Sequence, residues 1–170
     1  MIVIGMVVAM ASVQAAAQEP LVQFVRRRSL IYTTEKIEVY EGGWNKEAGR
    51  SEYKVHFSWS WFQPDGDWKG GAWLDSRSCP AVRTVLGSLE SLDMPKPQPW
   101  KRSPPMIDGI FYSLEAPTGY QEGKVTITSN EYSPLATWVD RSMAALMVCV
   151  PEADRIPFGR RSQRRSPANP

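Results

Sequence analysis

The chain has a single histidine, His56, followed at intervals of two residues by Ser58 and Ser60. In an extended strand these three side chains share one face, because successive side chains point to opposite sides. A histidine beside a serine is a base–nucleophile arrangement, although polar residues on an open sheet face usually only meet solvent. The sequence has no G-x-S-x-G, and no S-x-x-K followed by its partner motifs. Hydrolysis by His56, or by carboxylates that meet in space, is therefore kept as an alternative hypothesis.

Metal-binding and phosphate-binding patterns are weak. One histidine and two cysteines supply too few ligands for a structural zinc site if the cysteines pair with each other. Asp65, Asp67 and Asp75 offer oxygen ligands, but their spacing departs from an EF-hand, and the segment 64–67 is typical of a solvated turn. The glycine pairs at 42–43 and 70–71 lack the spacing of a phosphate loop. We predict no metal and no cofactor.

Tryptophan is the residue type that points most clearly to binding. Five of the seven lie within thirty residues, at positions 44, 59, 61, 68 and 73. An indole ring stacks on sugars or flat apolar ligands while its N–H group bonds outward. The alternating row over 53–61 is better explained as the core face of a strand. The candidate binding residues are therefore Trp68, Trp73 and Trp44, with Asp65 and Asp67 in the neighbouring turn.

The first seventeen residues are almost all apolar or small and end in three alanines before Gln18. This pattern predicts a secretory signal peptide over 1–17, although no Lys or Arg precedes the apolar run. An uncleaved anchor is the alternative, but the run is shorter than the roughly 20 residues of a membrane span. We expect an exported protein, either periplasmic or secreted, with one domain over 18–153.

The two cysteines are expected to form a disulfide, as is usual in exported chains. Cys79 stands at the start of one predicted helix and Cys149 at the end of another, so antiparallel packing of the helices would bring them together. Closing a loop of about 70 residues contributes roughly 4 kcal/mol in the chain-entropy model. Two free thiols, or one catalytic cysteine, are the alternatives, and there is no C-x-x-C.

The net charge of +2 is unevenly distributed along the chain. From Asp154 onward, five arginines stand against one acid, whereas the remainder has fifteen basic and seventeen acidic residues. A slightly acidic body argues against nucleic-acid binding. The tail 154–170 is poor in apolar residues and is predicted to be disordered, with contact to an anionic surface as one use of its charge.

Two segments show helical periodicity. In the first, Val82, Leu86, Leu89 and Leu92 lie on one face, with Pro80 suited to the first turn and Ser78 or Cys79 as the N-cap. The second is predicted from Pro134 to Val148, with the same chemistry at its start, although residues 144–150 are apolar enough to form a buried strand instead.

Strand-like segments occur in neighbouring pairs. The clearest is Glu52–Trp61, followed by a turn and a return strand at Trp68–Leu74, where Gly70-Gly71 indicates a bulge or a close backbone approach. Further strands are expected over 21–25 and 30–33, with three arginines between them, and over 35–40, 107–114 and 123–128. Residues 41–50 are predicted to form a loop.

Together these patterns predict an α+β fold, in which two helices pack on one face of an antiparallel sheet of five to six strands. The leading functional hypothesis is an exported, non-enzymatic binding or interaction domain for a protein or glycan ligand. The alternatives are a small exported hydrolase and a carbohydrate-binding module that uses the tryptophans. In each case the site is expected on the sheet face opposite the helices or at the glycine-rich end of the hairpin.

Overall fold

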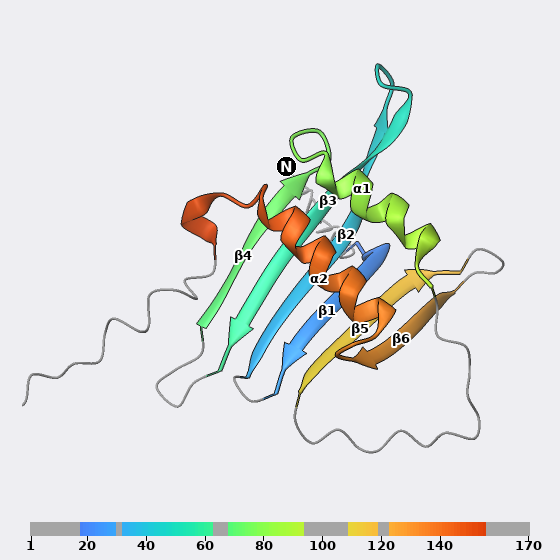
Figure 1. The fold of residues 1–170 in the computed structure, drawn as a ribbon. Helices are drawn as coiled ribbons and strands as arrows, with labels where there is room; N and C mark the ends of the chain where they lie inside the picture. Colours follow the sequence, from blue (N-terminus) through green and yellow to red (C-terminus); the bar gives the residue numbers. More distant parts are fainter. Residues whose placement is uncertain (1–17, 30–31, 63–67, 94–108, 119–122, 156–170) are drawn as a thin grey trace, which may run out of the picture.

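The computed structural model describes residues 18–29, 32–62, 68–93, 109–118 and 123–155. A six-stranded antiparallel sheet, with strand order β4-β3-β2-β1-β5-β6, is covered on one face by two helices (Figure 1). The predicted fold class, with both helices on one face, is confirmed. The predicted signal peptide and nearly all of the basic tail lie outside the described residues.

The described elements are six strands, two α-helices and two short 3-10 turns. The strands are β1 (Val22–Arg28), β2 (Thr33–Asn45), β3 (Arg50–Trp61), β4 (Trp68–Asp75), β5 (Ile110–Pro117) and β6 (Lys124–Asn130). The helical segments are α1 (Ala81–Ser88), the 3-10 turns η1 (Leu89–Ser91) and η2 (Glu152–Asp154), and α2 (Pro134–Met147). The predicted pairs β3–β4 and β5–β6 both form, and β1 joins the halves by pairing with β2 and β5.

Alternation along the strands separates a core face from an open face. Residues that are opposite each other in register share a face, and the core row across the middle of the sheet contains Leu114, Phe24, Ile37 and Phe57, all fully buried. The row predicted over 53–61 does face the helices. Its burial fades toward the strand end, since Trp59 and Trp61 are only half-buried, at the end of β3 that α2 leaves uncovered as it crosses the sheet obliquely (Figure 1).

Strand β1 continues through the three arginines that were expected to interrupt it. The expectation was wrong because the alternation gives Arg26 and Arg27 suitable environments on opposite faces of the sheet. Arg26 lies on the core face, where Glu35 and Asp140 neutralise it, and Arg27 is exposed on the other face.

The segment predicted as a loop over 41–50 is instead the tip of a long β2–β3 hairpin, which extends beyond the other strands (Figure 1). Strand β2 continues to Asn45 across a register shift between Glu41 and Gly43. Gly43 and Gly49 adopt φ values of 88° and 60°, which glycine tolerates without steric cost. Of the glycines that suggested a loop, Gly43 lies at the bulge of β2 and Gly49 lies in the turn of the hairpin.

Helix α2 begins as predicted. Ser133 is the N-cap, and its Oγ accepts the backbone N–H of Ala136 at 2.9 Å. Helix α1 differs, because its N-cap is Pro80 and no side chain caps it, while Ser78 Oγ donates to the carbonyl of Asp75. The strand alternative for residues 144–150 is wrong, since helix α2 extends to Met147.

The two helices are antiparallel and are connected near both ends. The predicted disulfide between Cys79 and Cys149 is present, with 5.8 Å between the Cα atoms. Near the other end, the indole N–H of Trp138 donates to Ser88 Oγ at 2.8 Å. The Trp138 ring also meets Phe24 edge to face at 5.0 Å, which fixes α2 to the sheet. Within the described ranges no helix has the length and apolarity needed to cross a membrane.

Candidate functional site

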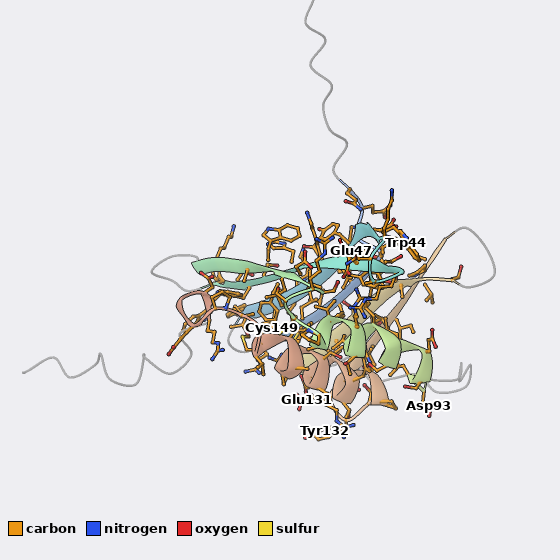
Figure 2. The ribbon with its side chains drawn as sticks, turned by 90° about the horizontal axis from the view of Figure 1, so that it is seen from above. Trp44, Glu47, Asp93, Glu131, Tyr132 and Cys149 are labelled. Atoms are coloured by element: carbon orange, nitrogen blue, oxygen red, sulfur yellow. A yellow bond between two sulfur atoms is a disulfide. The ribbon has the colours of Figure 1, made fainter. Side chains whose placement is uncertain are left out.

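The predicted binding residues do not form one cluster. Trp73 of β4 is 61% exposed on the open face. Trp44 is 64% exposed and lies at the hairpin tip, where Figure 2 labels it. Their partners in β3 are His56 and Ser51, so roughly 17 Å of strand separates the two tryptophans. Trp68 begins β4, and Asp65 and Asp67 lie outside the described residues. The binding role of all five residues stays a prediction. Trp73 is the one with aromatic and polar side chains close to it.

Three aromatic rings from three adjacent strands meet on the open face. His56 and Trp73 are opposite each other in the β3–β4 register, and their rings stack with centroids 4.6 Å apart and an angle of 22°. Tyr40 of β2 approaches the same indole at 5.5 Å. The sequence placed His56 on the open face, but it did not show that Trp73 and Tyr40 are its neighbours, because that requires the register of three strands.

Glu38 holds the imidazole from the other side. Its Oε2 lies 3.2 Å from His56 Nδ1, and its Oε1 accepts a hydrogen bond from Lys36 Nζ at 2.8 Å. Burial raises the pKa of the Glu38 carboxyl, but the hydrogen bonds and charges of Lys36 and His56 outweigh it, so the net pKa is lowered. The ionised carboxylate therefore orients His56. Burial and the charge of Glu38 raise the pKa of Tyr40.

The glycine pair of β4 makes room for rings on both faces of the sheet. A Cβ on Gly71 would lie 2.9 Å from the carbonyl oxygen of Phe57 and 3.1 Å from His56 Nε2. A Cβ on Gly70 would come within 2.5 Å of the Trp59 indole. The predicted close approach is thus confirmed, whereas the bulge is wrong, because β3 and β4 pair in regular register.

A cavity of 360 Å³ borders Trp73, with Lys54, Asp75 and Ser78 among its lining residues. Lys54 and Asp75 are opposite each other in register. The indole is therefore flanked by a cation, a carboxylate and a hydroxyl group, which together offer hydrogen-bond donors and acceptors to a ligand.

The neighbouring serine is not joined to His56 in this geometry. Ser58 Oγ donates to the carbonyl oxygen of Lys36 at 3.5 Å. Over the described ranges, no three His, Cys, Asp or Glu side chains gather in a way that would hold a metal ion. The rings of Tyr40, His56 and Trp73 together supply an oriented imidazole beside an exposed aromatic surface.

Sequence reasoning missed an ion-pair network on the core face. Arg26 donates two hydrogen bonds to Glu35, at 2.5 and 2.8 Å, and one to Asp140 at 2.7 Å. Burial works to lower the pKa of Arg26, but these carboxylates outweigh it and raise the pKa. Burial, together with a hydrogen bond to Asp140, raises the pKa of Tyr112 to about 12. One signal was present in the sequence: Glu35 alternates in phase with Ile37, so a carboxylate had to enter the core and required a partner.

A second buried carboxylate, Glu52, connects the hairpin to α1. It is 1% exposed and accepts hydrogen bonds from Ser76 Oγ at 2.5 Å, from Asn45 Nδ2 at 3.0 Å and from the guanidinium of Arg83. The hydrogen bond from Ser76 lowers the pKa of Glu52 against the effect of burial, and Asn45 and Arg83 add to the lowering. These contacts join β2, β3 and α1, so the group is structural.

Comparison with protein-family models, curated proteins and solved structures gives no significant match to this chain. The functional conclusion therefore depends on the geometry around Trp73.

Proposed function

We propose that this protein is an exported, non-enzymatic binding domain that holds a carbohydrate ring against Trp73. The supporting observation is an indole, 61% exposed on the uncovered sheet face, beside a cavity lined with hydrogen-bonding groups. A sugar ring presents an apolar C–H face and a rim of hydroxyl groups, and an indole surrounded by polar side chains is complementary to both.

The neighbours of Trp73 keep its ring in place before any ligand arrives. His56 stacks on the indole, and Glu38 fixes His56. A side chain that is already ordered loses little rotamer entropy on binding, so more of the contact energy appears as affinity. Lys54, Asp75 and Ser78 would then contact the hydroxyl rim.

Export is supported by two observations. The segment 1–17 has the composition of a signal peptide, and the disulfide between Cys79 and Cys149 is the kind of bond that persists in oxidising compartments.

Calorimetric titration of the full exported chain with a panel of neutral, amino and acidic oligosaccharides tests this function. Trp73→Ala should weaken binding about ten-fold or more, as expected on removing an aromatic anchor. Trp44→Ala is the matched control, because Trp44 is equally exposed but lies at the hairpin tip, and it should keep the affinity. Equal losses in both variants, or binding that survives Trp73→Ala, would contradict the proposal.

Hydrolysis remains a second candidate on one observation, namely that a carboxylate orients the only imidazole. The arrangement would let His56 act as a general base toward a ligand held at Trp73. A panel of glycoside and ester substrates, with His56→Ala as the comparison, tests it. Turnover that is unchanged in His56→Ala would remove this residue from consideration.

A further inference from the structure

A larger cavity, of 650 Å³, lies on the opposite side of the sheet from Trp73, between the ends of β1 and β2 and one side of α2. In Figure 1, α2 crosses the helix-bearing face of the sheet obliquely, so it covers only part of that face. The volume of the cavity falls within the roughly 300–1,000 Å³ that is usual for small-molecule sites. Nothing in the proposed function around Trp73 uses it.

The cavity is polar at one wall. Three arginines and two carboxylates line it, at positions 26, 28, 155, 35 and 140, so its formal charge is +1. Each of the three guanidinium nitrogens of Arg26 donates a hydrogen bond to Glu35 or Asp140. A monoanion would balance the charge that remains.

The other two arginines of the cavity, Arg155 and Arg28, differ in their hydrogen bonds. Arg155 donates to the backbone carbonyls of Val150 and Val148, at 3.0 and 3.4 Å. The Nε of Arg28, in contrast, is buried and has no hydrogen-bond partner within the described part of the chain. Arg28 thus brings an unpaired cationic N–H to a wall of the cavity.

Thr33, a buried neighbour of Arg28 that is not itself among the lining residues of the cavity, provides a second unpaired group. It is opposite Arg28 in the β1–β2 register and is 2% exposed, and its Oγ1 also has no partner among the residues described. An unsatisfied buried polar group is costly, and two adjacent ones are rare in native structures. One carboxylate can accept hydrogen bonds from both groups.

The remaining wall is apolar. Met143, Ala144 and Met147 of α2 line it. Methionine side chains are flexible and polarizable, so they adapt to chains of different shape. This wall suits a hydrocarbon tail beside the polar end.

We propose that this cavity binds a carboxylate with an alkyl chain, that is, a monoanionic amphiphile. Arg28 and Thr33 hold the carboxylate, and Met143 and Met147 contact the alkyl chain. A free fatty acid and an anionic phospholipid in a membrane both present an anionic head and alkyl chains, and the experiment distinguishes them.

The test is calorimetric titration of the full exported chain with decanoate, compared with decanol, decyltrimethylammonium and acetate. Decanoate should bind, and each of the other three should bind about ten-fold or more weakly, because each lacks the carboxylate or the tail. Equal affinity for decanoate and decanol would overturn the proposal. Binding to vesicles of anionic phospholipid without binding to free decanoate would overturn it in favour of a membrane surface.

Two neighbouring arginines provide matched variants. Arg28→Gln and Arg27→Gln remove the same charge, but Arg27 is exposed on the open face. Decanoate affinity should fall about ten-fold or more in Arg28→Gln and stay unchanged in Arg27→Gln. Equal effects in the two variants would show a nonspecific charge attraction and would contradict the site.

Thr33→Val keeps the test decisive if Arg28→Gln does not fold. The substitution preserves the side-chain shape and removes the unpaired hydroxyl, so the melting temperature should hold or rise while decanoate affinity falls. A Thr33→Val protein that melts like the wild type and binds decanoate equally well would remove Thr33 from the site and overturn the assignment.

Discussion

Arg26 and Glu35 face each other across β1 and β2 and are joined by two parallel hydrogen bonds, at 2.5 and 2.8 Å, on the core side of the sheet. Asp140 binds the remaining guanidinium nitrogen from α2. This pair allows an arginine-rich strand to occupy the centre of the sheet beneath a helix.

Removing one partner of this pair should destabilise the protein strongly. Glu35→Ala leaves Arg26 largely buried beside only the half-exposed Asp140, and we expect a loss of about 3 kcal/mol or more in the free energy of unfolding. The double variant Arg26→Met/Glu35→Leu should recover most of that loss, because it leaves no unpaired charge. Urea denaturation of the three proteins measures both effects. A double variant no more stable than Glu35→Ala would contradict this account of the pair.

The disulfide should contribute measurably to stability. Replacing Cys79 and Cys149 with serine removes a closed loop of 70 residues, which should lower the free energy of unfolding by about 4 kcal/mol in the chain-entropy model. Reductant should lower the free energy of unfolding of the wild type by the same amount, and it should leave that of the variant unchanged. Mass spectrometry after alkylation gives a direct check, since two alkylated thiols without reductant would show that the bond does not form.

Two glycine-to-alanine changes should act in opposite directions. Gly71→Ala would place a Cβ 2.9 Å from the Phe57 carbonyl and 3.1 Å from His56, and should cost about 1–3 kcal/mol by overpacking. Gly87→Ala, in α1, meets nothing within 4 Å and should gain up to about 1 kcal/mol of helix propensity. Thermal unfolding compares them. Destabilisation by Gly87→Ala, or no effect of Gly71→Ala, would contradict the geometry described for these positions.

Tyr112 should make stability depend on alkaline pH. Its pKa is raised from 10.0 to about 12 in the folded protein. A raised pKa means that the unfolded chain loses the proton first, so the stabilising contribution of Tyr112 is complete below pH 10 and disappears as the pH rises toward about 12. Stability of the wild type should therefore fall more steeply than that of Tyr112→Phe in this window, as measured by denaturant midpoints. Parallel curves would exclude this role.

The features that were predictable from sequence are those encoded by neighbours in the chain. The alternation of β3 placed Val55 and Phe57 in the core, and Ser133 followed by proline marked the start of α2. The disulfide could be predicted because each cysteine stood at the end of a local helical pattern. In each case a few consecutive residues carried the whole signal.

The features that were missed depend on distant partners. Arg26 appeared to interrupt a strand because Asp140, which binds it, is 114 residues away. The stack of His56 on Trp73 likewise depends on the register between two strands, which the pattern of either strand alone does not specify. Charge and ring pairing are properties of the assembled sheet, so local patterns could name candidate residues but could not assemble the site.

The bond between Cys79 and Cys149 also divides the chain mechanically. Strands β5 and β6 and both helices lie inside the covalent ring, whereas β1 to β4 lie outside it. A force applied to the two ends of the chain would bypass the enclosed 70 residues, which hold roughly 240 Å of extended length. Under tension β1 to β4 would unfold and extend, whereas the residues between the two cysteines would add no length. Those residues would extend only after the disulfide is reduced.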